Sequence, residues 1–426
     1  MVVQVRGKYR DLWAFLRQPL QRRRRIRRAS PEFLPPDPLQ ALTSTLHPER
    51  LELAVEQMRQ ETPFARTFKL VPAAGDSEGR PDRLPPFRAG QYLSLEFFVQ
   101  GVRVSRPYSI CSSPTEAEAG NYYEVTIRRR EKGFVAPYIW EHWRPGTRVW
   151  SSGPLGQFSY EPLRDRGELV LLAGGCGITP FRSLWRELRA NHPQVSCAIL
   201  YGADGPEEFI FRRELETLAG QRPERFRVYF VAADPDPQWE GLTGLLTGER
   251  IRELAGDPAS DGTPSDKTFF ICGPPGLYRF LEEELKPFHL PPGALRKEAC
   301  GESEDVVLRP DFPDDLKDRV FMLRVHRGEN SCEIPARASE SVLIALEKAG
   351  LAPPAQCRSG QCGYCRSQVL NGRIYVLPET DGRRQADRRF GYFHPCSSYP
   401  LTDLKIRVPV NPLTPAAEGS EIMNVK

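Results

Sequence analysis

Four cysteines in the last quarter of the chain have the spacing of an iron–sulfur site. Cys357, Cys362 and Cys365 follow a C-x4-C-x2-C pattern, and Cys396 lies further along the sequence. Two irons bridged by two sulfides need four thiolates, and this is the ligand spacing of plant-type [2Fe–2S] ferredoxins. The pattern therefore predicts that these four cysteines bind a [2Fe–2S] cluster.

The residues between the cysteines suit a loop that wraps around a cluster. Gly360 and Gly363 permit the backbone to curve tightly, and the small side chain of Ser359 lets backbone N–H groups approach the sulfurs. The alternatives are a zinc site or buried thiols. Zinc sites usually repeat a C-x2-C pair, so the sequence favours the iron–sulfur cluster.

A second group of residues could bind a flavin. Arg106, Tyr108 and Ser109 belong to the sequence RPYS. An arginine can clamp a phosphate with two N–H groups, a tyrosine ring can cover the isoalloxazine, and a hydroxyl can hydrogen-bond its reactive nitrogen. Further along, Gly133 opens a predicted helical stretch whose N-terminus could face a pyrophosphate. An ordinary strand is the alternative for RPYS alone.

Two further groups could bind a nicotinamide nucleotide. One is a glycine turn directly after a predicted strand at 168–173, and its residues are Gly174, Gly175, Gly177, Ile178, Thr179 and Pro180. Glycines let a backbone approach a pyrophosphate, the threonine could cap the next helix, and the proline suits a first helical position. The other is Cys272-Gly273-Pro274, which follows a later strand, where open α/β sheets bind ligands. A bare turn and a buried thiol are the alternatives.

The elements that must position these groups follow two patterns. From about 49 to 162, short alternating stretches divided by Gly and Pro predict an antiparallel β-barrel, with strands at 90–99, 106–113, 122–130 and 147–154. From about 166 to 300, strands alternate with helices, which predicts a doubly wound parallel sheet. The strands are expected at 168–173, 196–203, 227–233 and 268–273, and the helices at 181–190, 211–219 and 277–285.

The remaining region has the pattern of an α+β, ferredoxin-like (β-grasp) domain. A strand at 320–327 and a helix at 341–350 precede the cysteine loop. We therefore expect a multidomain chain, divided into a basic N-terminal extension (1–48), a flavin-binding β-barrel (49–162), an NAD(P)-binding α/β domain (163–300), a linker (301–319), a [2Fe–2S] domain (320–412) and a C-terminal tail (413–426).

Taken in this order, the four groups resemble the ferredoxin–NADP reductase-like flavoproteins with a fused C-terminal plant-type ferredoxin domain. Phthalate dioxygenase reductase and hybrid cluster protein reductase share that domain order. The resemblance covers about residues 50–412. It implies that the RPYS residues bind flavin, that the glycine turn binds nucleotide phosphates, and that Cys272, with Gly273 and Pro274, lies near the nicotinamide. Tyr108, Ser109 and Cys272 would then surround the site of hydride transfer.

Two motifs depart from the pattern of this family. A G-x-x-S/T motif reads Gly133-Phe-Val-Ala136, so one hydroxyl contact to the flavin phosphates is missing. The family's C-terminal E-x-F motif reads Glu298-Ala-Cys300 in this chain. The aromatic residue of the motif is therefore missing here, and a stacking role for it cannot be transferred. The basic strand at 122–130 and the helix after Gly133 favour FAD, with FMN as the alternative.

The residues after the strand at 196–203 favour NADH over NADPH. A 2′-phosphate calls for Arg or Lys at this place, and the sequence offers Asp204, with Glu207 and Glu208 after it. Arg212 and Arg213 follow on the predicted helix and are expected to face solvent. NADPH would be used if one of them bound the phosphate.

Composition adds a charge asymmetry. The 426 residues carry a formal net charge of +4, and residues 1–30 hold ten Lys/Arg against one acid, Asp11. Trp13 and Leu16 lie on an apolar stripe of this extension, so we expect it to dock on an acidic protein acceptor. A solvated tail, a membrane surface, a transit peptide and nucleic acid are the other possibilities.

The cysteine usage and the absence of long apolar runs suggest a cytoplasmic protein that does not span a membrane. The function expected from all these features is an NADH-dependent oxidoreductase, which passes electrons from NADH through FAD and a [2Fe–2S] cluster to an external protein. The alternative from another class is a redox-sensing or regulatory module that binds flavin and cluster without turnover.

Overall fold

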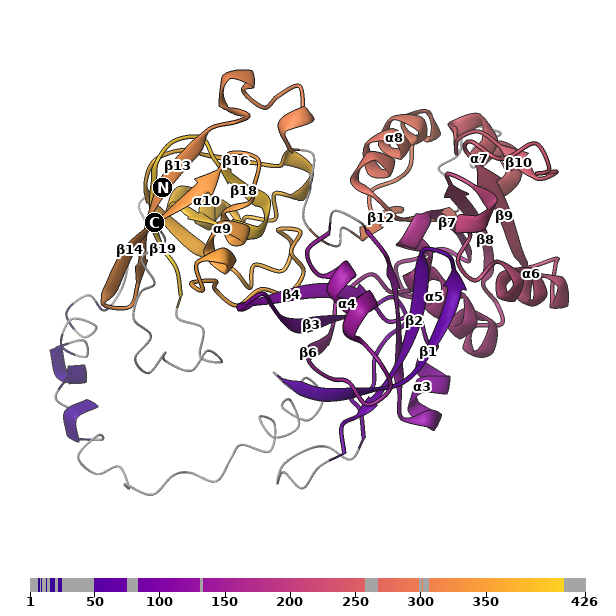
Figure 1. Ribbon diagram of the computed structural model, residues 1–426, viewed down its shortest axis with the longest axis horizontal. Helices are drawn as coiled ribbons and strands as arrows, with labels where there is room; N and C mark the ends of the chain where they lie inside the picture. Colours follow the sequence, from indigo (N-terminus) through magenta and orange to yellow (C-terminus); the bar gives the residue numbers. More distant parts are fainter. Residues whose placement is uncertain are drawn as a thin grey trace. The chain divides into compact units, whose positions relative to one another are not determined.

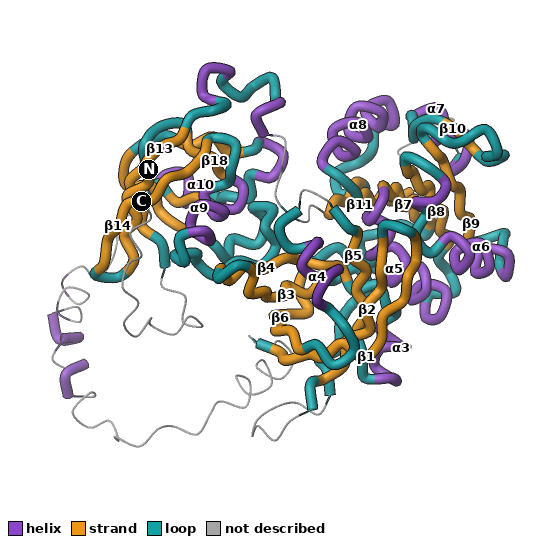
Figure 2. Tube along the Cα trace, in the orientation of Figure 1, coloured by secondary structure: helices purple, strands orange, loops and turns teal. Residues whose placement is uncertain are grey.

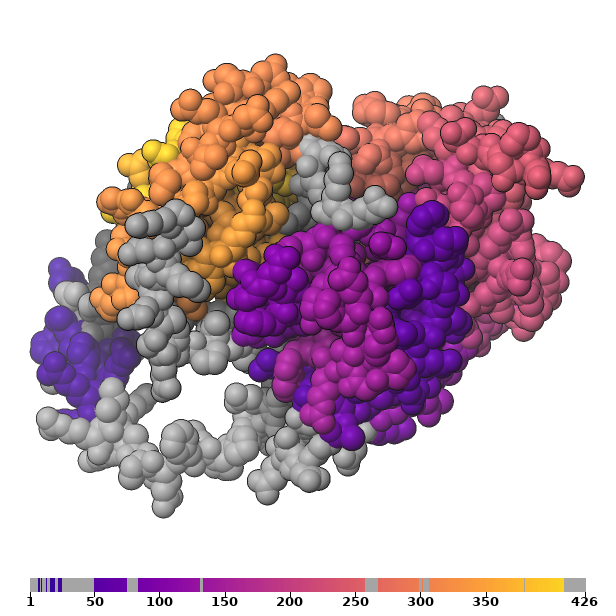
Figure 3. Space-filling model, viewed as in Figure 1, coloured from indigo at the N-terminus to yellow at the C-terminus, as the bar shows by residue number. Residues whose placement is uncertain are grey.

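The computed structural model describes residues 50–74, 83–130, 133–256, 267–298, 301 and 306–409, with isolated residues between 7 and 24. Contacts divide the chain into two units, Met1–Leu46 and His47–Lys426. The three large sheets belong to the second unit and follow one another along the chain, as the colours of Figure 1 show, and the surface atoms of these regions carry the same colours in Figure 3. No helix in the described ranges is long and apolar enough to cross a membrane.

The first sheet is antiparallel, with strand order β4-β3-β6-β1-β2-β5. Its strands bury alternate residues in one core, as Leu51, Leu53 and Val55 do on β1. A bridge between Ile110 and Val125 joins the chain after β4 to β5, at the other edge. The predicted antiparallel β-barrel is confirmed. Its elements are β1 (Leu51–Thr62), β2 (Ala65–Pro72), β3 (Tyr92–Val99), β4 (Val102–Ser109), α3 (Pro114–Gly120), β5 (Tyr123–Arg128), α4 (Ala136–His142) and β6 (Arg148–Leu155).

The strands β1 and β2 were not singled out from the sequence. The alternation of apolar residues on β1 stops after Val55, and polar residues occupy most of its second half. That half is held by its pairing with β2, which runs to Thr62 and Ala65 at the hairpin. A strand that is stabilised by a neighbour in this way has a weak pattern of its own.

The second sheet is parallel, with strand order β10-β9-β8-β7-β11-β12. Leu169 and Leu171 of β7 pack in a cluster with residues of α5 and α6, whereas Val170 and Leu172 pack in another with α7 and α8. Helices therefore cover both faces, as Figure 2 shows, and the predicted doubly wound sheet is confirmed. Its elements are β7 (Glu168–Gly174), α5 (Ile178–Asn191), β8 (Ser196–Ala203), α6 (Arg212–Gln221), β9 (Phe226–Ala232), β10 (Leu242–Thr243), α7 (Gly248–Ala255), β11 (Lys267–Cys272), α8 (Pro275–Leu285) and β12 (Leu295–Glu298).

The third sheet is mixed, with strand order β14-β13-β19-β15-β17 and a separate pair β16-β18. Its long strand β13 runs parallel to β19 and antiparallel to β14. Helix α9 is capped by Ser341, which accepts the N–H of Ile344, and it buries Val342 and Leu346 in the core of the domain. The ferredoxin-like α+β domain is confirmed. Its elements are β13 (Val320–Arg327), β14 (Asn330–Arg337), α9 (Val342–Lys348), β15 (Ser367–Asn371), β16 (Ile374–Val376), α10 (Gln385–Arg389), β17 (Tyr392–Phe393), β18 (Ser398–Pro400) and β19 (Leu404–Arg407).

Candidate functional site

The glycine turn lies at the middle of the parallel sheet. Strand β7 pairs with β8 on one side and with β11 on the other, so the carboxyl ends of β7 and β11 flank the crevice where open α/β sheets bind ligands. A Cβ on Gly177 would lie 1.9 Å from the carbonyl oxygen of Cys272, and one on Gly174 would lie 2.7 Å from Leu277. Gly177 is thus required by the close approach of the two backbone segments, whatever ligand binds there, whereas at Gly174 the Leu277 side chain could move aside.

The start of α5 differs from the expectation. Thr179 donates its hydroxyl to the carbonyl of Cys176 at 3.0 Å, and the capping position is held by Gly177, which has no side chain. Pro180 is the third residue of α5 and not the first. Both predictions about this helix start were wrong, because a turn of 3-10 helix, Gly175–Gly177, leads directly into α5.

Three buried side chains from separate strands meet at the carboxyl end of β11. The carboxylate of Glu298, at the end of β12, accepts a hydrogen bond from Ser109 Oγ at 3.5 Å and faces Cys272 Sγ at 3.9 Å. Ser109 ends β4, so this contact joins the barrel to the parallel sheet. The structure brings the predicted Ser109 and Cys272 together through Glu298, which the sequence marked only as part of an altered motif.

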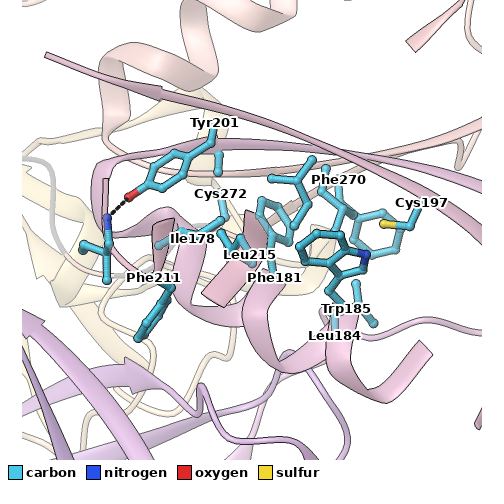
Figure 4. Packing of buried hydrophobic residues seen from close by; sticks show 14 of the residues in the cluster. Ile178, Phe181, Leu184, Trp185, Cys197, Tyr201, Phe211, Leu215, Phe270 and Cys272 are labelled. Atoms are coloured by element: carbon cyan, nitrogen blue, oxygen red, sulfur yellow. Dashed lines mark hydrogen bonds between the residues drawn. The ribbon is translucent and has the colours of Figure 1, made fainter. Parts of the chain in front are cut away.

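Tyr278 on α8 fixes this arrangement. Its hydroxyl donates to the backbone carbonyl of Glu298 and accepts the N–H of Gly273 at 3.1 Å, while Pro274 precedes the first residue of α8. Burial, and then the neighbouring Glu298, raise the pKa of Cys272 well above its ordinary value. The Cys272 thiol is therefore neutral, and it lies with Ile178 in the apolar cluster drawn in Figure 4.

A positive charge lies beside the glycine turn. The guanidinium of Arg128, at the end of β5, comes within 3.2 Å of the position that a Cβ on Gly175 would take, and it pairs with Glu208 at 2.7 Å. Tyr201 donates its hydroxyl to the carbonyl of Gly175 at 2.8 Å and accepts the N–H of Ile210, the dashed line in Figure 4. An arginine beside a glycine turn suits a phosphate. From the sequence, only the basic strand at 122–130 was noted, and Arg128 itself was not singled out.

The predicted flavin residues lie along β4 and after β5. Tyr108 packs edge-on against Phe97 at 6.3 Å between ring centres, and burial raises the pKa of its hydroxyl. Arg106 donates to the carbonyl of Ser105 at 2.7 Å. The helix after Gly133 is α4, which begins at Ala136, so the expected helix start at Gly133 was three residues early.

The residues expected to select the nucleotide follow β8. Asp204 is exposed, and its carbonyl accepts the N–H of Asp234 at 2.9 Å. The guanidinium of Arg212 lies over the ring of Trp239 at 4.8 Å and pairs with Glu216 at 2.9 Å. Arg212 is therefore held by a ring and a carboxylate, and it does not simply face solvent as expected.

The structure brings the four predicted cysteines together in the third domain. Cys357, Cys362 and Cys365 lie on the loop between α9 and β15, and Cys396 lies on a short 3-10 helix, Pro395–Ser397. The sulfurs of Cys365 and Cys396 are 3.4 Å apart. Cys362 is exposed, whereas the other three are buried.

Backbone N–H groups of the loop point at the sulfurs. The N–H groups of Ser359 and Cys362 donate to Cys357 Sγ at 3.5 and 3.4 Å, and that of Gly360 donates to Cys396 Sγ at 3.2 Å. Hydrogen bonds from the Cys362 and Cys396 thiols, aided by these N–H groups, lower the pKa of Cys357. The backbone turns here with a φ of 77° at Gly360, a conformation that glycine adopts without steric strain because it has no Cβ.

The donor set fits a binuclear cluster better than a single ion. Among the described residues, no group of three or more His, Cys, Asp and Glu side chains could hold one metal ion. A [2Fe–2S] cluster asks for two thiolates at each iron, and Cys365 with Cys396 forms such a pair. The hydroxyl of Ser359 is buried in this loop without a hydrogen-bond partner in the structure, as expected beside a group that would accept from it.

Three family models match consecutive parts of the chain. They are an oxidoreductase FAD-binding domain over residues 80–160, an oxidoreductase NAD-binding domain over 171–283, and a 2Fe-2S iron-sulfur cluster binding domain over 325–401. With the fold, they identify a ferredoxin–NADP reductase-like flavoprotein that carries a C-terminal [2Fe–2S] domain. Such a chain is an oxidoreductase that passes electrons from a nicotinamide nucleotide through a flavin to an iron–sulfur cluster.

The chain is similar to several reductases along most of their length. It is 26% identical over 331 residues to the glycine betaine monooxygenase reductase subunit of Chromohalobacter salexigens, covering 75% of this chain and 87% of the relative. It is 28% identical over 355 residues to NADH oxidoreductase HCR of Escherichia coli, covering 83% and 96%. Phthalate dioxygenase reductase shares the fold, with a TM-score of 0.59, 24% identity, and coverage of 85% of this chain and 98% of that chain.

Proposed function

We propose that this protein is the NADH-dependent reductase component of a larger redox system, with an oxygenase as its acceptor. The observation that carries the proposal is the Ser109–Glu298–Cys272 contact at the crevice of the parallel sheet, on a chain that also carries the four-cysteine loop. Relatives named as monooxygenase reductase components support an oxygenase acceptor. The domain boundaries given above remain part of this proposal.

We assign roles to residues of each site. The cluster ligands are Cys357, Cys362, Cys365 and Cys396. The flavin residues are Arg106, Tyr108, Ser109 and Gly133, and the nucleotide residues are Gly174, Gly175, Gly177, Ile178, Thr179, Pro180, Asp204, Cys272, Gly273 and Pro274. To these the structure adds Glu298 as the carboxylate between Ser109 and Cys272, and Arg128 as a cation beside the glycine turn.

A flavin held by Arg106, Tyr108 and Ser109 would supply acceptance of a hydride and release of single electrons, and a cluster held by the four cysteines would supply one-electron transfer. The protein supplies position and a dry environment. Ser109 and the neutral Cys272 present a hydroxyl and a thiol at the meeting point of the barrel and the parallel sheet, and Tyr278 holds Glu298 behind them. No general acid or base is required at this place for hydride transfer.

We propose NADH over NADPH and FAD over FMN. Asp204 and Glu207 place negative charge after β8, and Arg212 is engaged by Trp239 and Glu216. These contacts support a site where Arg212 is already engaged, and Arg213, which is exposed, is the other cation that could bind a 2′-phosphate. The basic end of β5 and the helix α4 after Gly133 support FAD, whereas Arg128 lies beside the glycine turn assigned to the nucleotide.

We propose that the basic N-terminal extension docks the reductase on its acceptor. Its described residues include Tyr9, Trp13 and Leu16, which are exposed, and Arg17 lies over the ring of Trp13 at 5.2 Å. Of the arginines between 22 and 28, Arg22, Arg23 and Arg24 are described and the other three lie outside the described residues. Deleting residues 1–30 should slow reduction of the physiological acceptor, most at low salt, and leave reduction of a small dye by NADH unchanged. Loss of flavin on deletion would contradict the docking role.

The reductase proposal is tested with the purified full chain. It should bind flavin together with about two irons and two sulfides per chain, and NADH should bleach both absorptions. A chain that is reconstituted without oxygen and binds zinc but no sulfide would contradict it. A chain that binds both cofactors but does not accept electrons from NADH would favour the sensing module. The cytoplasmic location stays a prediction.

A further inference from the structure

Three charged side chains connect the proposed flavin-binding strand with the cysteine loop: Arg106, Glu347 and Arg358. Glu347 on α9 binds Arg358 of the loop with both carboxylate oxygens, one of them at 2.9 Å. The same oxygen, Oε2, lies 3.7 Å from a terminal nitrogen of Arg106 on β4. The side chains of Glu347 and Arg358 are only 5% and 1% exposed. One buried carboxylate therefore faces an arginine from each of two domains.

The inner pair fixes the loop at the residue next to a cysteine. Arg358 follows Cys357 directly, and its φ of 54° places it in the left-handed region, which side chains other than glycine seldom adopt. A buried guanidinium is stable only with a partner of opposite charge. Glu347 is that partner, so it holds the backbone at Cys357 in this conformation.

The contact between Glu347 and Arg106 lies at the interface between β4 and the iron–sulfur domain, which we call a seam. Ser105, the residue before Arg106, donates its hydroxyl to the carbonyl of Ala355 at 2.9 Å. A cleft of about 90 Å³ along this seam is lined by residues of both domains, among them Ser105, Glu347 and Tyr364. Arg106 thus belongs both to the RPYS motif and to this seam.

We propose that Glu347 is a positioning residue that docks the iron–sulfur domain on β4 by binding Arg106 and Arg358 together. The inference rests on the proposed function, in which Arg106 also holds the flavin. A guanidinium carries five N–H donors, so one arginine can hold a phosphate and a carboxylate at the same time. Through Glu347, the residue that binds the flavin and the loop that binds the cluster are held in one arrangement for transfer of one electron from reduced flavin to oxidised cluster.

The first test compares Glu347→Gln with the matched control Glu340→Gln in the holoenzyme. Glu340 binds Lys348 with both oxygens, at 2.8 and 2.7 Å, within the iron–sulfur domain. After rapid mixing with NADH, flavin reduction should keep its rate in both variants. Cluster reduction should slow about tenfold in Glu347→Gln, which corresponds to about 1.4 kcal/mol for a lost charge-assisted contact, and should not change in Glu340→Gln. Equal cluster reduction in the two variants would overturn the proposal.

The second test measures docking without electron transfer. In the oxidised holoenzyme, hydrogen exchange of the backbone amides between Gly350 and Gln356, apart from the two prolines, should speed up in Glu347→Gln and in Arg106→Gln. The double variant should be no faster than Glu347→Gln alone, because Glu347→Gln already removes the contact that Arg106→Gln removes. Additive effects would show that the two side chains act separately, and they would overturn the proposal.

A third variant covers the case in which Glu347→Gln fails to bind the cluster. Glu347→Leu with Arg358→Met removes the buried pair without leaving a charge uncompensated. This variant should bind the cluster and still reduce it slowly, whereas a normal rate would overturn the docking role. If the wild-type cluster is not reduced by NADH at all, the proposed function fails. If it is reduced normally and the Glu347 variants behave as wild type, only this inference fails.

Discussion

The barrel meets the nucleotide domain through a buried arginine and meets the iron–sulfur domain along one edge strand. Arg182 of α5 is 3% exposed and binds Glu124 of β5 at 2.7 Å, Glu214 of α6 at 2.8 Å, and the carbonyl of Cys111 at 2.8 Å. The other seam joins β4 to Glu347 of α9 and to the loop around Ala355, and a cleft lies along it.

The difference between the two seams agrees with the kind of transfer that each must support. Hydride transfer requires two rings at fixed contact, and reacting groups about an ångström out of place can lose much of the rate. A single electron needs no bond to form, so a lighter seam is sufficient for it. We infer that the barrel and the nucleotide domain form the rigid seam, whereas fewer contacts, with Glu347 among them, hold the iron–sulfur domain on β4.

The largest effect is expected from removing a cluster ligand, because this change should abolish electron transfer to the acceptor and leave hydride transfer to the flavin intact. Cys362→Ser replaces an exposed thiol that accepts the N–H of Tyr364 at 3.4 Å. Reduction of a one-electron protein acceptor should fall to background, and NADH should still reduce the flavin, because that step precedes the cluster. Cys332→Ser, at an exposed cysteine on β14, is the control and should have no effect. Normal acceptor reduction by Cys362→Ser would remove the cysteine from the assigned ligands.

The second prediction addresses the rigid seam. Arg182→Leu leaves the carboxylates of Glu124 and Glu214 without their guanidinium, so the free energy of unfolding should fall by about 3 kcal/mol, and flavin reduction by NADH should slow. Urea denaturation and rapid mixing measure these two quantities. Arg186→Leu removes a half-exposed arginine that binds Glu116 and Glu214, and it should cost about 1 kcal/mol or less. Equal losses in the two variants would show that burial of Arg182 is not what strengthens this seam.

The third prediction concerns the contact inside the rigid seam. Cys272→Ala should slow flavin reduction by about tenfold, equal to about 1.4 kcal/mol of activation free energy, and change the affinity for NADH much less. Cys197→Ala, at a buried cysteine of the same apolar cluster, is the control for packing. Equal losses of rate and affinity in Cys272→Ala would indicate a packing role for Cys272.

The pH dependence of the same step follows from the raised pKa of Cys272. A thiol whose pKa is raised stays protonated below that value, and the ordinary pKa is already near 8.5. The rate of flavin reduction should therefore show no inflection from Cys272 between about pH 6 and 8. An inflection in this range that disappears in Cys272→Ala would contradict the neutral thiol.

The smallest effect is expected at the nucleotide-selecting loop. Asp204→Asn removes one exposed charge, so kcat/KM for NADPH should rise about threefold and the gain should shrink at high salt. Glu224→Gln is the control, because Glu224 is an exposed carboxylate that precedes β9, at the amino end of the parallel strands and away from Asp204. A preference of the unaltered protein for NADPH would instead assign the 2′-phosphate to Arg212 or Arg213.

The sequence alone was enough to predict the folds of the three domains and to select the four cysteines proposed as cluster ligands. Apolar alternation and strand–helix alternation are local patterns, and cysteine spacing reflects how one loop can wrap a cluster. The glycine turn was also found, although not for its full reason. That Gly177 must lack a Cβ depends on Cys272, whose backbone reaches it only in the folded sheet.

Only the tertiary structure could reveal the residues that join distant segments. Glu298 lies between Ser109 and Cys272, and Glu347 lies between Arg106 and Arg358. In the sequence these glutamates look like any other charged residues near a strand end or on a helix. Their importance comes from burial and from opposite charges or polar groups supplied by other strands, and these depend on long-range packing that no local pattern records.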